Sequence, residues 1–162
     1  MRRLTPILSA TLVVAALSGA QALPAQGAAA ATKKLTWGPA PPALPSGARI
    51  AVVDGDPTKT GPFTIHLLLP SRYSIAPHSH PTDETITVLR GTFKYGMGDK
   101  WDTKSMQALP RGGSGTMKAG QNHYARAVGR TEISIQSTGP FEINYVNPKD
   151  DPRNRKGNKT KV

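Results

Sequence analysis

The sequence predicts an all-β domain, folded as a sandwich or barrel of short strands. In several stretches apolar residues alternate with polar ones, which is the pattern of strands that bury one face. Turn residues separate these stretches at short intervals, and the 162-residue chain contains 16 Gly and 15 Pro. No window after the N-terminal segment has the periodicity of an amphipathic helix. A chain of this length supports one domain with its own core rather than two.

The expected strands follow one another along the middle of the chain. In residues 63–69 every second residue, starting from Phe63, is apolar. Residues 84–90 and 131–137 alternate in a similar way. Residues 49–54 are apolar and β-branched, and residues 141–146 alternate again. The sequences between them, such as DGDP, PTDE and PRGGSG, are rich in residues that favour turns.

Residues 1–22 have the composition of an export signal. Arg2 and Arg3 precede a short apolar stretch, and small residues at Ala20 and Ala22 suit cleavage. The apolar stretch is shorter than the about 20 residues that cross a bilayer, so no membrane span is expected after cleavage. We expect cleavage after residue 22 or later, up to residue 31, and a periplasmic or extracellular (secreted) protein. The general and the twin-arginine export routes both stay open.

Two segments of low complexity flank the predicted domain. Residues 23–46 are rich in Ala and Pro and predict an extended, largely unpacked leader, with Trp37 docked on the domain surface. Residues 149–162 are basic and lack apolar residues before Val162, so a disordered tail is expected. The barrel itself is assigned to residues 47–148.

The positive charge of the chain lies mainly in its ends. The net charge is +11, but residues 49–148 carry eleven Lys and Arg against eight Asp and Glu. This distribution argues against a specific nucleic-acid partner, although the basic tail is suited to attachment to cell-surface polyanions. The chain has no cysteine, so it forms no disulfide and offers no thiolate to a metal.

The heptapeptide HSHPTDE, residues 78–84, predicts a metal site. Residues i and i+2 of a strand share a face, so His78 and His80 point the same way. After the turn, Glu84 begins the next strand, where its carboxylate can return beside the imidazoles. Two imidazoles and a carboxylate suit a divalent transition metal.

His123 is a third candidate ligand, again at the start of a strand-like stretch. A single histidine is more often a structural residue held by hydrogen bonds. Inward imidazoles beside a carboxylate, however, are costly to bury unless something satisfies them, and a metal does so. An octahedral ion held by these four residues keeps two positions for water, dioxygen or a chelating substrate.

The spacing of these residues resembles the cupin superfamily. His78-x-His80, three residues, Glu84, six residues and Gly91 follow the first cupin motif. The second motif is seen from Gly112 to His123. The wider chain resembles small exported bacterial single-domain (type 2-like) cupins, over about residues 37–153. The features shared with them are a Trp-x-x-Ala-Pro leader, a GDP turn and a GPF…YVNP…DDPR ending.

Three positions depart from the family pattern. Arg72 replaces a glycine that precedes the first histidine, and Lys118 replaces the proline of the second motif. Ala127 stands where some members have asparagine. All four ligand positions are intact, so these departures concern local backbone geometry.

The resemblance implies a double-stranded β-helix, the cupin jelly-roll barrel, with a metal inside one end. The metals common in the family are Fe, Mn, Zn, Ni and Cu, and the sequence does not select among them. The expected function is a metal-dependent enzyme acting on a small organic molecule by oxygenase, lyase or isomerase chemistry. The alternative is a non-catalytic metal- or ligand-binding module. A homodimer through the edge strand at residues 49–54 is a further expectation.

No catalytic residue is assigned beyond the ligands. His66, on the strand before the motif, is either a supporting donor, a general base or, more often for such a position, a surface residue. Several side chains are candidates for the mouth of the barrel: Tyr73, Trp101, Tyr124, Gln136 and Tyr145.

Overall fold

The structure is a computed structural model, and it describes residues 34–154. Those residues form eleven strands and a single 3-10 turn. In chain order the elements are β1 (Gly38–Pro39), β2 (Arg49–Asp54), β3 (Gly61–Leu69), β4 (Ser74–Ser79), β5 (Glu84–Arg90), β6 (Thr92–Met97), β7 (Gln107–Pro110), β8 (Ser114–Met117), β9 (His123–Ala127), β10 (Thr131–Gly139), β11 (Asn144–Tyr145) and η1 (Pro152–Asn154).

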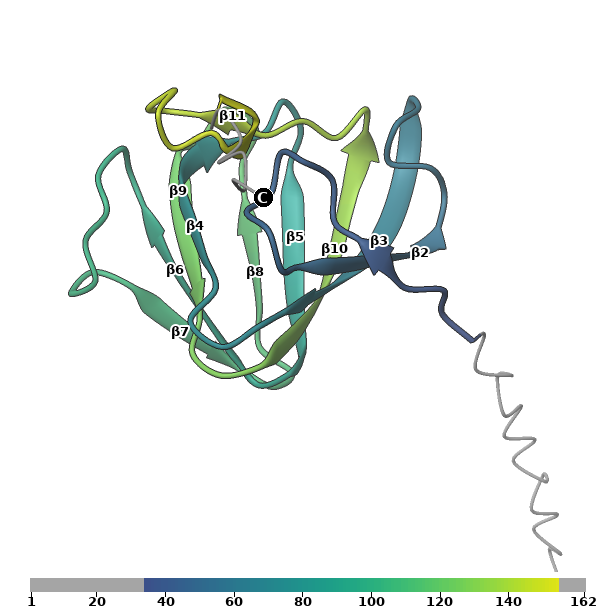
Figure 1. The fold of residues 1–162 in the computed structure, drawn as a ribbon, viewed down its shortest axis with the longest axis horizontal. Helices are drawn as coiled ribbons and strands as arrows, with labels where there is room; N and C mark the ends of the chain where they lie inside the picture. The colour runs from purple at the N-terminus through teal and green to yellow at the C-terminus, as the bar shows by residue number, and fades with distance from the viewer. Residues whose placement is uncertain (1–33, 155–162) are drawn as a thin grey trace, which may run out of the picture. The chain divides into compact units, whose positions relative to one another are not determined.

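The strands form two antiparallel sheets that face one another, as Figure 1 shows. One sheet has the order β1-β2-β3-β10-β5-β8, and the other has the order β11-β4-β9-β6-β7. The predicted all-β fold is therefore confirmed. The strand expected at residues 141–146 is reduced to the two residues of β11, because the preceding residues form a loop.

The core lies between the sheets and follows from the alternation seen in the sequence. Along β3, Phe63, Ile65, Leu67 and Leu69 are all buried, whereas the residues between them are only half-buried. The neighbouring strand β10 pairs with β3 over its whole length and adds further buried isoleucines. Burying one face of each strand in this way stabilises the pair of sheets mainly through the hydrophobic effect.

An irregularity in β4 decides which of its residues face the interior. The pairing of β4 with β9 shifts register between Ile75 and His78. Ile75 and His78 are three residues apart, yet both are buried and line the interior. A bulge re-aims the side chains that follow it, and Pro77, which has no N–H to donate, lies within this one. The shift therefore turns His78 inward.

The leader is packed on the domain over its described part. Leu44 is buried, the Tyr145 hydroxyl donates to the Ala43 carbonyl at 2.8 Å, and the Tyr73 hydroxyl donates to the Pro45 carbonyl. Trp37 is half-buried, and its carbonyl accepts from Arg49. The expectation of a largely unpacked leader is wrong for residues 34–46, because tyrosine hydroxyls from the domain hold its carbonyls.

The first residues of the predicted tail are also packed. Arg153 binds the Asp151 carboxylate and donates to the Ile143 carbonyl at 2.9 Å, and Asn154 donates to the Pro148 carbonyl. The domain therefore extends beyond residue 148. The export signal, the leader up to residue 33 and the tail from residue 155 lie outside the described residues.

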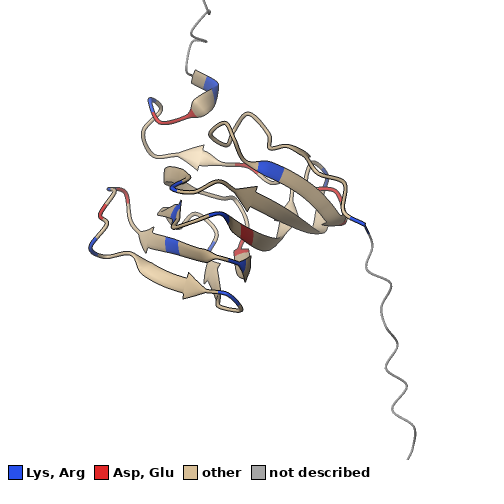
Figure 2. Cartoon of the chain, turned by 60° about the horizontal axis from the view of Figure 1, so that its bottom comes forward, with Lys and Arg blue, Asp and Glu red and all other residues tan. Residues whose placement is uncertain are grey.

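Charged residues are spread over the domain rather than gathered on one face. In Figure 2 the Lys and Arg positions are scattered over several loops and strands, with Asp and Glu among them. Residues 34–154 contain no helix of the length and apolarity that crossing a membrane requires.

Candidate metal centre

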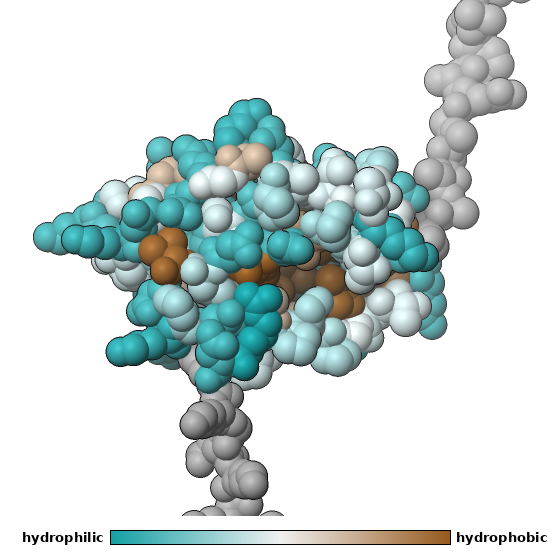
Figure 3. Space-filling view, turned by 90° about the horizontal axis from the view of Figure 1, so that it is seen from above, coloured by the Kyte–Doolittle hydropathy of each residue, from teal (hydrophilic) through white to brown (hydrophobic). Residues whose placement is uncertain are grey.

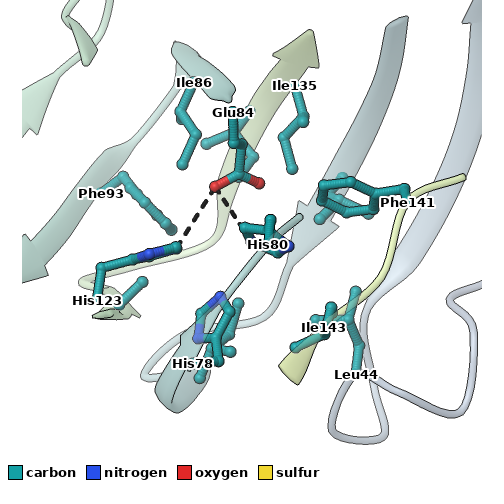
Figure 4. A pocket seen from close by; sticks show the side chains of 14 residues that line it. Leu44, His78, His80, Glu84, Ile86, Phe93, His123, Ile135, Phe141 and Ile143 are labelled. Atoms are coloured by element: carbon teal, nitrogen blue, oxygen red, sulfur yellow. Dashed lines mark ion pairs between the residues drawn. The ribbon is translucent and has the colours of Figure 1, made fainter. Parts of the chain in front are cut away.

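Four predicted site residues converge inside one end of the barrel. His78 on β4 is the direct partner of His123 on β9, and His80 follows β4 by one residue. Glu84 is the first residue of β5, in the facing sheet. In Figure 4 the three imidazoles and the carboxylate point toward one another.

The distances in this cluster are short. Nitrogen atoms of His78, His80 and His123 lie within 4.8 Å of one another. The Glu84 Oε2 atom is 3.5 Å from Nε2 of His80 and 3.5 Å from Nε2 of His123. All four residues are at most 3% exposed. The three histidines form a group that could hold a metal, and the Glu84 carboxylate lies beside two of them.

Each imidazole is oriented by a backbone carbonyl on the side away from the cluster. Nδ1 of His78 lies 2.7 Å from the Ala76 carbonyl, and Nδ1 of His123 lies 3.0 Å from the Gln121 carbonyl. Nδ1 of His80 lies 2.6 Å from the Glu142 carbonyl. A carbonyl only accepts, so each Nδ1 carries the proton and donates it. Nε2 of each neutral ring then presents a lone pair.

The surroundings favour neutral rings. Burial lowers the pKa of His78 well below its usual value, and the neighbouring His123 and His80 lower it further. Burial also lowers the pKa of His80, although the Glu84 carboxylate opposes this effect. The buried Nε2 atoms of His80 and His123 have no hydrogen-bond partner. Unpaired buried polar atoms are costly, so an electron-pair acceptor at this point would stabilise them.

These residues fit a divalent transition metal. Histidine ligands usually donate their other ring nitrogen to a carbonyl or carboxylate, and all three rings here do so. Three imidazole nitrogens and one carboxylate oxygen suit iron, manganese, nickel, copper or zinc, and this donor set does not select among them.

The cluster forms one wall of a small cavity of about 30 Å³. That volume holds only one or two water molecules. Apart from the four site residues, every side chain that lines the cavity is apolar: Leu44, Leu67, Ile75, Ile86, Phe93, Ala125, Ile133, Ile135, Phe141 and Ile143. Seen from above, hydrophobic atoms occupy a recess between hydrophilic rims (Figure 3).

Three of these lining residues come from segments outside the main strands. Leu44 belongs to the leader, and Phe141 and Ile143 belong to the loop after β10. The Phe141 ring stacks on the His80 ring, with centroids 4.5 Å apart and an interplanar angle of 16°. None of the three was predicted as a site residue. Phe141 and Ile143 fall in the expected strand at residues 141–146, and the loop that replaces most of this strand brings them to the cavity.

The other candidates lie outside the cavity. His66 is on β3, with Nδ1 3.6 Å from a Glu132 carboxylate oxygen, and does not line the site. The Tyr124 hydroxyl donates to the Asp102 carbonyl, away from the histidines. The Tyr145 ring centroid lies 5.8 Å from that of His78. The cavity is therefore lined by Leu44, Phe141 and Ile143 rather than by the side chains expected at the mouth of the barrel.

Comparison with known families settles the fold family. Residues 25–141 match the family described as the ChrR cupin-like domain. The chain belongs to the cupin superfamily. Comparison of this cupin with curated protein sequences gave no match.

Two solved structures are similar to this chain at low sequence identity. A putative acetylacetone dioxygenase from Methylibium petroleiphilum PM1 is 22% identical, with a TM-score of 0.55, over 73% of this chain and 79% of that one. KdgF from Halomonas sp. is 15% identical, with a TM-score of 0.49, over 64% of this chain and 84% of that one. At these identities the likeness concerns the fold alone.

The glycines of the two cupin motifs occupy left-handed backbone positions. Gly91 has a φ of 83°, Gly112 of 82° and Gly120 of 71°. Arg72, which replaces a family glycine, also has a positive φ, at 61°. Lys118, which replaces a family proline, instead pairs with the Asp83 carboxylate at 2.7 Å. Arg72 therefore adopts a positive φ of the kind that glycine adopts freely, and Lys118 forms an ion pair.

Proposed function

We propose that this cupin holds one divalent transition metal through Nε2 of His78, His80 and His123 and the carboxylate of Glu84. The observation that carries the proposal is the common orientation of the three rings. Every Nδ1 is bound to a backbone carbonyl, so every lone pair on Nε2 is free for a ligand bond. The lowered pKa values of His78 and His80 keep those rings neutral at physiological pH.

We further propose that the protein is an enzyme acting on a small organic molecule. A bound metal would supply Lewis-acid or redox chemistry to a substrate at its free positions. Glu84 would balance part of the positive charge and hold the site between the two sheets. The apolar walls would exclude water from the reacting molecule. Oxygenase, lyase and isomerase chemistry all remain open, because the fold alone does not define the reaction.

The second candidate is a non-catalytic metal- or ligand-binding module. The residues that line the cavity include no acid or base other than the four metal-site residues, and this favours the second candidate. A substrate screen of metal-loaded protein against the His80→Ala variant separates the two candidates. Turnover that requires both metal and His80 supports the enzyme, whereas binding without turnover across the screen supports the module.

Export to the periplasm or the medium is part of the proposal and rests on the N-terminal sequence. N-terminal sequencing of protein recovered from outside the cytoplasm should place the mature start after residue 22 and no later than about residue 32. Recovery of the intact N-terminus only from the cytoplasm would contradict export.

A further inference from the structure

The character of the cavity walls restricts what this site can bind. Ten apolar side chains surround the four site residues, and no Lys, Arg, Ser, Thr, Asn or Gln lines the cavity. A substrate held only by its donor atoms at the metal would leave its remaining atoms against Ile86, Ile135 and Phe141, which Figure 4 shows around the cluster. A charged or strongly hydrogen-bonding group there would lose its water without gaining a partner.

Two cationic side chains on segments next to the site are already engaged. Arg153 lies behind the loop after β10, where it donates to the Ile143 carbonyl and binds both oxygens of the Asp151 carboxylate. Lys118 pairs with Asp83 at the surface. Neither residue lines the cavity. An anionic group at the far end of a substrate would therefore meet no counter-charge from the protein.

Phe141 limits the size of the cavity beside the histidines. Its ring packs flat on His80 and edge-on against Phe63, with centroids 5.3 Å apart in the second pair. The cavity of about 30 Å³ that remains is too small for an organic molecule. To fill this cavity, a ligand larger than water or dioxygen would have to displace lining side chains such as Phe141, Ile143 or Leu44, which Figure 4 shows on one side of the cluster.

We propose that the site accepts a small molecule with metal-binding oxygen atoms and an apolar remainder, and that Phe141 sets the size of that remainder. This inference rests on the proposed metal site. It assigns Phe141 a role in specificity, because the ring covers the cavity without being placed to react. It also predicts discrimination against molecules with a second, distal carboxylate.

Two probes that differ only at their far end test the polarity of the cavity. Butanohydroxamic acid and succinic acid monohydroxamate share the same metal-binding head, but the first ends in a methyl group and the second in a carboxylate. Each is titrated into protein loaded with Co²⁺, and binding is followed by the visible spectrum of the cobalt. The methyl-ended probe should bind at least about 100-fold more tightly, given the cost of burying an unpaired charge. Equal binding, or tighter binding of the carboxylate-ended probe, would overturn the inference.

Benzohydroxamic acid tests the size limit. Phe141→Ala should bind this larger probe more tightly than the wild type by about 10-fold or more, in line with the cost of displacing a buried side chain. Phe63→Leu is the matched control, because Phe63 is buried against Phe141 but does not line the cavity. Ile143→Ala serves as a second variant on the same side. An equal gain in Phe63→Leu, or no gain in either lining variant, would contradict the role of Phe141.

A metal-free arm separates this inference from the proposed metal site. Without metal, Phe141→Ala should gain benzene binding, seen as a rise in melting temperature, because an enlarged apolar cavity stays dry and accepts apolar guests. Failure to bind Co²⁺ would refute the proposed metal site but would leave the expected benzene binding of the metal-free variant unchanged. Absence of benzene binding in both Phe141→Ala and Ile143→Ala would refute the apolar pocket, whatever metal the protein holds.

Discussion

His78 and His123 are direct partners across β4 and β9, and their ring centroids are 4.2 Å apart. Burial is the first cause of the lowered pKa of His78, and repulsion between a positive charge on this ring and the His123 ring is the second. His78 is thus held as a neutral ring, which is the form that binds a metal.

The metal-free protein should lose stability as the solution becomes acidic. The pKa values of His78 and His80 are lowered in the folded state, so the unfolded chain takes up protons first. Stability from these residues should be complete above the unfolded value of 6.5 and decrease as pH falls below it. Each proton taken up on unfolding contributes a slope of about 1.4 kcal/mol per pH unit.

Denaturant unfolding of metal-free protein between pH 8 and pH 5 measures this slope. His78→Gln should reduce it, because the variant lacks one of the two imidazoles whose pKa is lowered in the folded state. A free energy of unfolding that rises below pH 6.5 in the wild type, or an unchanged slope in His78→Gln, would contradict the role of buried neutral imidazoles.

Glu84→Gln should weaken metal binding while preserving the fold. The substitution keeps the shape of the side chain but removes the charge 3.5 Å from Nε2 of two histidines. Residues that only support ligands already change affinity by about 10- to 100-fold, so loss of a ligand charge should cost at least as much. Calorimetric titration with Zn²⁺ measures the change, with circular dichroism as the check on folding.

The matched control is Glu132→Gln, whose carboxylate faces His66 rather than the site. If Glu84→Gln binds Zn²⁺ as tightly as Glu132→Gln does, Glu84 is not a ligand.

Arg72→Gly should stabilise the protein. Arg72 has a φ of 61°, a conformation that costs a residue with a side chain about 1–2 kcal/mol and that glycine adopts freely. The greater freedom of glycine in the unfolded chain offsets part of this gain, so an increase of about 0.5–1 kcal/mol is expected. Arg111→Gly, at an exposed turn without a positive φ, should destabilise or have no effect. Thermal unfolding of both variants compares them, and a lower melting temperature for Arg72→Gly would exclude strain at this position.

Gly91→Ala should destabilise the protein by about 1–3 kcal/mol. Its φ is 83°, and a Cβ atom there would lie 2.7 Å from the Arg130 carbonyl and 2.8 Å from Thr131 Oγ1. Gly129→Ala is the control, because a Cβ atom at Gly129 meets nothing within 4 Å. Similar free energies of unfolding for the two variants would show that the turn relaxes around the added methyl group.

The sequence was sufficient to predict the strands and the candidate ligands for a physical reason. Alternation along β3 is a local pattern that maps directly onto one face of a strand. The two-residue spacing places His78 in β4 and His80 one residue beyond its end. The inward orientation of His78 could not be predicted from local sequence, because it depends on the shift of register near Pro77. That shift appears only when β4 is paired with β9.

The lining residues that lie outside the main strands could not be predicted in the same way. Leu44 lies in a segment without periodicity, and the alternation of residues 141–146 predicts a strand without showing that Phe141 reaches the cavity. The acceptor for His80 is the carbonyl of Glu142, whose backbone position no side-chain pattern reveals. The predicted unpacked leader was wrong over residues 34–46 for a related reason, since the tyrosines that hold it are remote in sequence.

Elemental analysis of protein purified from its native compartment, without chelators, tests the central claim most directly. The account predicts close to one equivalent of a divalent transition metal per chain in the wild type and a severe loss in His80→Ala, with His66→Ala unchanged. Folded wild-type protein without a transition metal, and unable to take one up at neutral pH, would contradict it.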